Sequence, residues 1–196
     1  VEVGTLMIAA AVTQGDVFIE GAVPDHIEPL IRKMKEAGAD VEVTNQGIRV
    51  VGKQPLQAVD IETMPFPGFP TDMQAQFMSM LCVSKGTSVV TETIFENRLI
   101  QVHEMNRMGA NIRIEGNTAI VEGCETLTAA PVMASDLRAS ASLVIAGLCA
   151  NGATLVDRIY HIDRGYECIE EKMQLLGASI RRIPGRLSNE QSEQSS

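Results

Sequence analysis

The sequence is poor in aromatic residues and in positive charge, and it contains no tryptophan. Aromatic residues make up 4% of the 196 residues, so the hydrophobic content of 45% comes mainly from aliphatic side chains and methionine. A chain of this length and composition can bury a substantial core. Sixteen basic residues against 25 acidic ones give a formal net charge of −9, which disfavours non-specific binding to nucleic acid or to an anionic membrane. The composition predicts a soluble globular protein in which an anionic ligand would need a local arginine pocket.

Paired cysteines and metal-ligand clusters are also missing from the sequence. Cys82, Cys124, Cys149 and Cys168 form no C-x-x-C pair, and three of the four lie inside apolar helical patterns, where a buried free thiol is expected. We therefore predict neither a metal site nor a cofactor. No signal-like segment opens the chain, and no uninterrupted apolar run reaches membrane length. These features favour a reducing cytoplasm, and the start at Val1 leaves open that the chain is part of something longer.

What the chain does contain is an internal repeat. An apolar, helix-like run ends near a glycine three times, at Gly15, Gly86 and Gly152, which lie 71 and 66 residues apart. A short strand-like run follows each glycine, and then comes an amphipathic helix. Those helices end in a second set of glycines: Gly38, Gly109 and Gly177. Glycine suits the left-handed position that ends a helix, and the β-branched residues that follow suit a returning strand.

The repeat predicts units that run helix, strand, helix, strand. In the third unit the returning strand would carry Ile180 and Ile183. The first two units add a hairpin strand, at residues 47–51 and 118–122. We place the units at about residues 4–63, 71–134 and 136–183, so that residues 1–185 form one domain, and we expect residues 186–196, rich in Ser, Gln and Glu, to be a disordered tail.

The distribution of apolar residues predicts which elements are inside. The first helix of each unit is apolar nearly all round, which is typical of a helix surrounded by protein, whereas the second helices have one charged face. The fold class is therefore α/β (α+β), with three βαβαββ-like repeats around a pseudo-threefold axis and sheets outside. We predict an inside-out α/β barrel with central helices at residues 5–13, 73–85 and 137–150.

The segment that links the first two units has the most distinctive chemistry. Pro65, Pro67 and Pro70 prevent a helix from running through it, so a helix must begin after them. Thr71 or Asp72 could cap that helix, because a short side-chain oxygen accepts hydrogen bonds from the free N–H groups of the first turn. A capping role and a functional role for Asp72 both remain open on local pattern alone.

Four segments together resemble the bacterial UDP-N-acetylglucosamine 1-carboxyvinyltransferase family, whose members are enolpyruvyl transferases. They are FPTDMQAQ at 69–76, TIFENR at 93–98, MASDLRAS at 133–140 and DRIYHIDRGYE at 157–167. The resemblance runs from about residue 3 to residue 183. The sister family, 5-enolpyruvylshikimate-3-phosphate synthase, shares the inside-out barrel but not these segments. Members of the family have two such domains, and this chain resembles only the C-terminal half.

The resemblance implies transfer of the enolpyruvyl group of phosphoenolpyruvate to the 3′-hydroxyl of UDP-N-acetylglucosamine. This is the first committed step of peptidoglycan synthesis in the cytoplasm, and hence belongs to cell wall formation, cell shape and cell division. It implies that Asp72 is the general base and binds the nucleotide, that Ile94 binds the nucleotide through its backbone, and that Arg138 and Arg164 hold the anionic groups of phosphoenolpyruvate. It also implies a complementary N-terminal domain that carries the catalytic cysteine, and no cysteine of this chain matches that position.

Each of these residues also has a purely structural interpretation. Arg138 could form a surface ion pair with Asp136, and Arg164 could pair with Asp163 or Glu167. His103 lies mid-helix and favours a structural imidazole over an acid–base group. The alternative function is an isolated, non-catalytic domain that binds ligand weakly or not at all.

Overall fold

Three mutually packed helices form the centre of the computed structural model, which describes residues 1–185. They are α1 (Glu2–Val12), α3 (Gln74–Cys82) and α5 (Leu137–Cys149). Every residue of α3 is buried, and so are most residues of the other two. Phe77 of α3 is fully buried and meets the ring of Phe69 edge-on, with ring centroids 5.3 Å apart. The predicted burial of the three apolar helices is confirmed.

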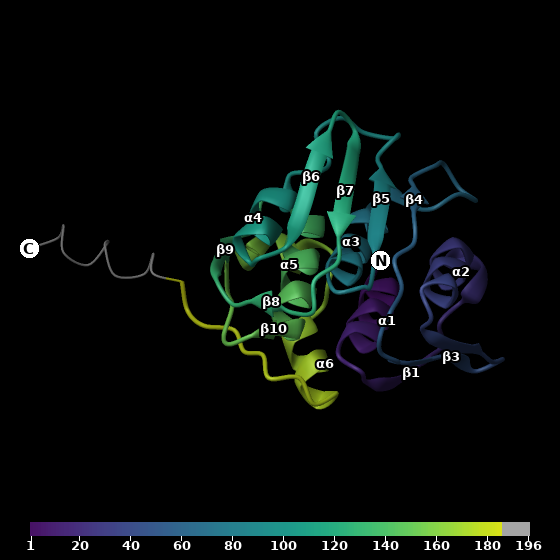
Figure 1. Ribbon diagram of the computed structural model, residues 1–196. Coiled ribbons are helices and arrows are strands. Elements are labelled where there is room, and N and C mark those ends of the chain that lie inside the picture. Colours follow the sequence, from purple (N-terminus) through teal and green to yellow (C-terminus); the bar gives the residue numbers. More distant parts are fainter. Residues whose placement is uncertain (186–196) are drawn as a thin grey trace, which may run out of the picture.

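The first unit places a helix and an antiparallel sheet beside this centre (Figure 1). Its sheet has the order β1 (Asp16–Glu20), β3 (Gly47–Val51), β2 (Asp40–Val43). A short 3₁₀ turn, η1 (Pro24–His26), leads into α2 (Glu28–Glu36), which buries Leu30, Ile31 and Met34. The strands predicted at 47–51 and after Gly38 are therefore present, and they form one hairpin.

The second unit repeats this plan with one extra strand. Its sheet has the order β4 (Ile61–Glu62), β5 (Thr87–Thr91), β7 (Thr118–Glu122), β6 (Asn111–Glu115), in which β4 runs parallel to β5 and the other pairs are antiparallel. The amphipathic helix α4 (Gln101–Arg107) precedes β6. β4 lies at the end of the first predicted unit, directly before the proline-rich connector, so the first unit contributes a strand to the sheet of the second.

The third unit departs from the predicted pattern. Its short strands β10 (Ala150–Asn151) and β11 (Leu155–Asp157) pair in parallel with β8 (Leu127–Thr128) and β9 (Pro131–Met133), which belong to the end of the second unit. The chain then forms η3 (Ile159–Arg164) and α6 (Ile169–Leu175).

The returning strand predicted around Ile180 and Ile183 is wrong, because residues 178–185 form no strand. In the first two units the returning strand is held by the hairpin strand that follows it, and within residues 1–185 the third unit has no such partner. Arg182 instead ties this segment to Asp163 and Glu170 through its guanidinium group.

The glycines that end the second helices adopt the predicted left-handed conformation. The φ angles of Gly38, Gly109 and Gly177 are +96°, +86° and +97°. An L-residue with a side chain rarely adopts such angles, so these positions explain why glycine recurs there.

Buried helices with sheets and amphipathic helices around them agree with the predicted α/β class. The pseudo-threefold relation, the closed barrel and the single-domain boundary remain predictions. The tail predicted at 186–196 lies outside the described residues. Among residues 1–185, no helix has both the length and the apolarity that crossing a bilayer requires.

Candidate active site

Asp72 lies in the 3₁₀ turn η2 (Thr71–Met73), which begins directly after the extended Pro70 and leads into α3. Neither η2 nor α3 has a side-chain capping hydrogen bond, so the capping interpretation of Asp72 is wrong. Its carboxylate instead faces two guanidinium groups. Arg138 donates from Nε to Oδ1 at 2.8 Å, with Nη2 at 2.6 Å from the same oxygen, and Nη1 of Arg98 lies 3.7 Å from it.

Arg138 contacts Asp72 while its near neighbour Asp136 is occupied in capping their helix. Asp136 is the N-cap of α5, where its Oδ1 accepts a hydrogen bond of 2.8 Å from the Ala139 N–H. The Asp136–Arg138 surface pair considered from the sequence is therefore wrong. Arg138 bridges from the third unit to the second, and its side chain is 27% exposed.

One oxygen of Asp72 carries all of these contacts. Oδ1 meets both arginines, and among residues 1–185 no hydrogen bond reaches Oδ2. The Asp72 side chain is 48% exposed, so a molecule from solution can reach it. A carboxylate oxygen of this kind can accept a hydrogen bond from a hydroxyl group and can take its proton.

Arg164 stands at the end of η3, which packs on α5, the helix of Arg138. It is exposed and forms no ion pair with another described residue. Asp163, its sequence neighbour, pairs with Arg182 at 2.6 Å, so the Arg164–Asp163 pair considered from the sequence is wrong. Hydrogen bonds from Arg182 hold the pKa of the Asp163 carboxyl below its ordinary value. The guanidinium group of Arg164 thus remains available for an anion.

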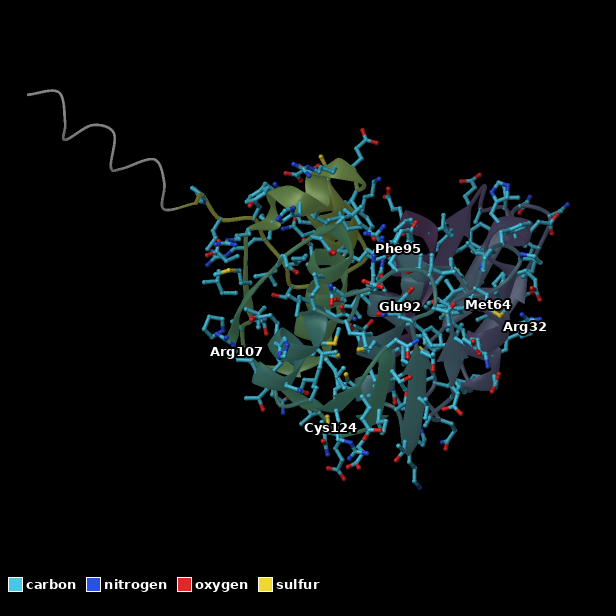
Figure 2. All side chains as sticks on the ribbon, turned by 90° about the horizontal axis from the view of Figure 1, so that it is seen from above. Arg32, Met64, Glu92, Phe95, Arg107 and Cys124 are labelled. Carbon is cyan, nitrogen blue, oxygen red and sulfur yellow. The ribbon has the colours of Figure 1, made fainter. Side chains whose placement is uncertain are left out.

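Ile94 belongs to the loop after β5, and this loop touches the Asp72 segment. The Ile94 N–H donates to Oε1 of the buried Glu92 at 3.1 Å, and Thr71 donates to the same carboxylate at 3.0 Å. Figure 2 shows Glu92 and Phe95 close together, away from Arg107 and Cys124. Three of the four residues assigned by resemblance therefore lie in two contacts that Thr71 joins: Asp72 with Arg138, and Ile94 with Glu92. Arg164, the fourth, takes part in neither contact.

Sequence reasoning missed Glu92 and Arg98 as parts of this region. Arg98 lies inside the segment TIFENR at 93–98, which carries part of the family resemblance, but its contacts with Thr71 and Asp72 were not predicted. Glu92 directly follows β5, where an acidic residue is usually solvated, and it nevertheless has 2% relative exposure.

Beside the Ile94 loop lies a cavity of about 420 Å³, lined by residues that include Phe95, Arg98, His103 and Asn117. The Arg98 guanidinium lies 4.0 Å from the centre of the Phe95 ring, a cation–π contact. His103 is exposed, which corrects its interpretation as a satisfied structural imidazole.

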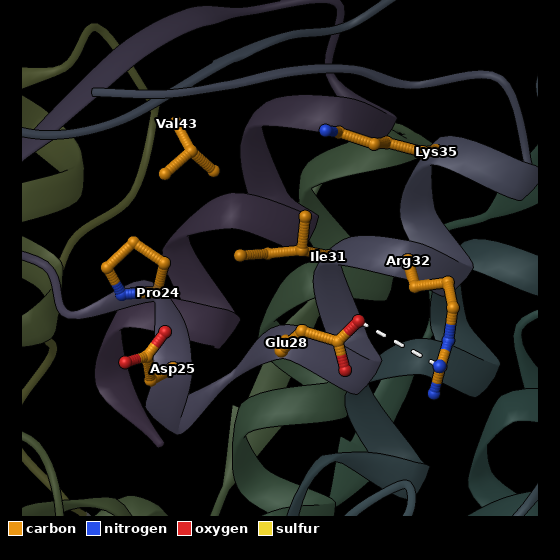
Figure 3. A pocket seen from close by; sticks show the side chains of 7 residues that line it. All are labelled: Pro24, Asp25, Glu28, Ile31, Arg32, Lys35 and Val43. Carbon is orange, nitrogen blue, oxygen red and sulfur yellow. Dashed lines mark ion pairs between the residues drawn. The ribbon is translucent and has the colours of Figure 1, made fainter.

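A second cavity, of about 390 Å³, lies on α2 and is shown in Figure 3. It is lined by Pro24, Asp25, Glu28, Ile31, Arg32, Lys35 and Val43. The charges on its lining are mixed, and Glu28 and Arg32 pair at 3.8 Å across a turn of the helix. It contains none of the residues predicted for the site.

Among residues 1–185, the cysteines and the acidic side chains form no second candidate site for catalysis or metal binding. Burial raises the pKa of Cys82 far above its ordinary value and that of Cys149 to about 11, so neither is a ready nucleophile. Cys168 is exposed. Within the described part of the chain, no group of three or more His, Cys, Asp or Glu residues could hold a metal ion.

Comparison with known proteins gives consistent matches. The family profile described as EPSP synthase (3-phosphoshikimate 1-carboxyvinyltransferase) matches residues 1–173. Two relatives, from Saccharophagus degradans and Desulfatibacillum aliphaticivorans, are named UDP-N-acetylglucosamine 1-carboxyvinyltransferase. They are 63% and 58% identical over 94% and 93% of this chain. The chain spans 44% of the length of each.

Solved structures agree with these sequence matches. The enolpyruvyl transferase NikO from Streptomyces tendae superposes with a TM-score of 0.85 at 25% identity, over 92% of this chain and 43% of that one. An EPSP synthase from Acinetobacter baumannii superposes with a TM-score of 0.61 at 18% identity, over 79% of this chain and 38% of that one, which supports the fold alone. The α/β class predicted from the sequence is confirmed.

Proposed function

Because this chain belongs to the EPSP synthase family, we propose that it supplies one of two domains of an enzyme that transfers the enolpyruvyl group of phosphoenolpyruvate to the 3′-hydroxyl of UDP-N-acetylglucosamine. The relatives with 63% and 58% identity carry the name of that activity, and this chain covers less than half of each. The reaction would serve peptidoglycan synthesis in the cytoplasm. The observation that carries the proposal is the half-exposed Asp72 carboxylate, which has one oxygen held by arginine and the other open.

Asp72 is the general base in this proposal. Oδ2 would accept the proton of the sugar 3′-hydroxyl as the 3′-oxygen of the sugar forms a bond to C2 of phosphoenolpyruvate. At the same time C3 gains a proton from an acid. Phosphate then leaves C2 and a proton leaves C3, which restores the double bond in the product. Arg138 fixes Oδ1, so the free oxygen keeps one orientation during the first step.

Ile94 would hold the sugar nucleotide through its backbone. Its N–H is already used by Glu92, so its carbonyl oxygen is the group left to meet a ligand hydroxyl.

The arginines provide the anion contacts. Arg164 is exposed and carries a planar fork that matches a carboxylate or a phosphate with two parallel hydrogen bonds. Arg138 has already committed two nitrogens to Asp72, so it would contact phosphoenolpyruvate with its remaining nitrogen or after leaving Asp72. Arg164 therefore carries the larger share of anion binding in the proposal.

The remaining groups would come from a complementary N-terminal domain that bears the catalytic cysteine. None of the four cysteines here forms a hydrogen bond with Asp72, and the two most buried have raised pKa values. The proposal needs no metal ion and no cofactor. If the chain instead acts as an isolated, non-catalytic domain, it will bind the nucleotide weakly or not at all and will have no turnover in any assembly.

The test uses a protein of the relatives' full length that carries this chain, with phosphate release measured while each substrate is varied in turn. Asp72→Asn keeps the shape but removes the base, so we expect kcat to fall more than the KM for the nucleotide rises. Arg164→Ala should lower kcat/KM for phosphoenolpyruvate, which corresponds to a loss of about 1.5–3 kcal/mol of transition-state stabilisation. Nucleotide affinity should stay nearly unchanged. Near-full kcat in Asp72→Asn would refute the assignment of the base.

A further inference from the structure

We propose that Glu92 is a positioning residue, which fixes the Asp72 segment (residues 70–73) and the Ile94 segment (residues 93–98) in one relative geometry through its buried carboxylate. The inference rests on the proposed function for its catalytic consequence, because those two segments would hold the same sugar nucleotide. Glu92 lines the cavity beside the Ile94 segment, but it has 2% relative exposure and its carboxylate is occupied by protein donors, so it acts through its neighbours.

The Glu92 carboxylate accepts hydrogen bonds from three different stretches of the chain. From the Ile94 segment, the Ile94 and Phe95 N–H groups donate to Oε1 at 3.1 and 3.3 Å. From the Asp72 segment, the Thr71 hydroxyl lies 3.0 Å from both carboxylate oxygens. From the residue directly after β4, the Thr63 hydroxyl donates to Oε1 at 3.0 Å. One side chain thus satisfies donors that are up to 32 residues apart in sequence, as the positions of Thr63 and Phe95 show.

Arg98 closes the same arrangement from the other side. Its Nη1 donates to Oγ1 of Thr71 at 3.1 Å and lies 3.7 Å from Oδ1 of Asp72. The backbone carbonyl of Arg98 accepts a bond of 3.4 Å from the Gln74 side chain, which also reaches Glu92 Oε2 at 3.5 Å. The position of Asp72 relative to Ile94 is therefore set by one hydrogen-bond network. In it Thr71 contacts both Arg98 and Glu92, and the Glu92 carboxylate accepts from both segments.

The network requires a carboxylate because every group that faces Glu92 is a donor. In Glu92→Gln the amide oxygen can replace Oε1, so Thr63 and the two backbone N–H groups keep a partner. The amide nitrogen then replaces Oε2, where it faces the Gln74 amide nitrogen, so two donors meet and Gln74 loses this acceptor. Thr71 is left with Oε1 alone, an oxygen that Thr63, Ile94 and Phe95 also use. A buried donor that loses its acceptor is destabilised, so the Asp72 segment is expected to move while the Ile94 segment stays.

The experiment compares four variants in the full-length protein that carries this chain. Glu92→Gln and Thr71→Val break the contact between the Thr71 hydroxyl and the Glu92 carboxylate, whereas Thr71→Ser keeps the hydroxyl. Glu122→Gln is the control for charge, because it also removes one carboxylate, at the last residue of β7. Steady-state phosphate release is measured with each substrate varied, and hydrogen exchange of the Met73 amide, which bonds to the Pro70 carbonyl in η2, reports the Asp72 segment directly.

We expect Glu92→Gln and Thr71→Val to lower kcat/KM for the nucleotide by about 10- to 100-fold, since a displacement on the order of 1 Å can cost that much. The KM for phosphoenolpyruvate should stay within about twofold, and Met73 should exchange about tenfold faster. Thr71→Ser and Glu122→Gln should match the wild type. A loss of kcat with both KM values unchanged and with unaltered Met73 exchange would mean only fewer folded molecules, and would overturn the inference.

Failure of the proposed function gives a different pattern. If the wild-type protein releases no phosphate, the proposed function fails, and the exchange measurement alone decides the role of Glu92. Faster Met73 exchange in Glu92→Gln and Thr71→Val, with Thr71→Ser unchanged, then supports positioning. Equal exchange in all variants refutes it.

Discussion

The contact between Asp72 and Arg138 predicts a measurable coupling free energy that does not depend on catalysis. Asp72→Asn and Arg138→Met each remove one charge, and the double variant removes both. Two charges about 4 Å apart attract by about 1 kcal/mol in water and by about 4 kcal/mol at an effective dielectric constant near 20. The side chains are 48% and 27% exposed, and exposed pairs usually couple by about 0.2–1 kcal/mol. Because Arg138 makes two contacts with Oδ1, we expect the upper end of that range, about 1 kcal/mol.

The assay is urea unfolding of the wild type, both single variants and the double variant, with the coupling taken from the cycle. Repeating it at about 1 M NaCl shortens the screening length to about 3 Å, so the coupling should fall by at least half. Arg113 and Glu115 form a matched control pair at 2.9 Å, with side chains 63% and 62% exposed, and their coupling should stay below about 0.3 kcal/mol. If Asp72 and Arg138 couple no more strongly than this control, the pair is not held in solution and the orientation argued for Oδ2 has no basis.

Three further outcomes follow from single features of the fold. Phe77→Ala should lower the free energy of unfolding by about 3–5 kcal/mol, because the side chain is fully buried among the central helices; a loss below about 1 kcal/mol in urea unfolding would show that the centre can collapse around the gap. Gly177→Ala should cost about 1 kcal/mol by thermal unfolding through its φ of +97° alone, since an added methyl group meets no atom within 4 Å, and an unchanged Tm would contradict this. Hydrogen bonds from Arg182 lower the pKa values of Asp163 and Glu170 on folding, so these contacts stabilise the fold at neutral pH and the stabilisation is lost as the pH falls below about 4. Arg182→Met should therefore flatten the curve of unfolding free energy against pH in that range. An unaltered curve would disprove the link.

The elements that the sequence predicted well are those whose signal is local. Apolar residues all round a helix indicate burial whatever surrounds it, and α3 is buried along its whole length. A glycine at the end of a helix reflects the backbone angle of that one residue, and Gly38 and Gly177 have the angles that were expected. Alternating β-branched residues followed by a turn led to β7, with the predicted bounds.

The elements that the sequence could not predict depend on partners far along the chain. Asp72 and Arg138 are 66 residues apart, so no spacing rule indicates that one holds the other, and Asp136 was the nearer and wrong choice. Glu92 resembles a solvated residue at the end of a strand until the Thr71 hydroxyl is placed against it. The β-branched residues near Ile180 have strand propensity, but a strand needs a neighbour, and propensity gives no information about that neighbour.

The parallel pairing of β11 with β9 has a consequence for the order in which the chain can fold. Each of the first two units contains one hairpin, whose two strands follow one another and can pair as soon as both have been synthesised. β9 must wait until all of α5 has been made before β11 can reach it, and β8 must wait in the same way for β10. Such contacts close long loops and form slowly. On the ribosome, the second unit would therefore leave the exit tunnel with β8 and β9 still unpaired, and the last third of the chain would supply their partner strands.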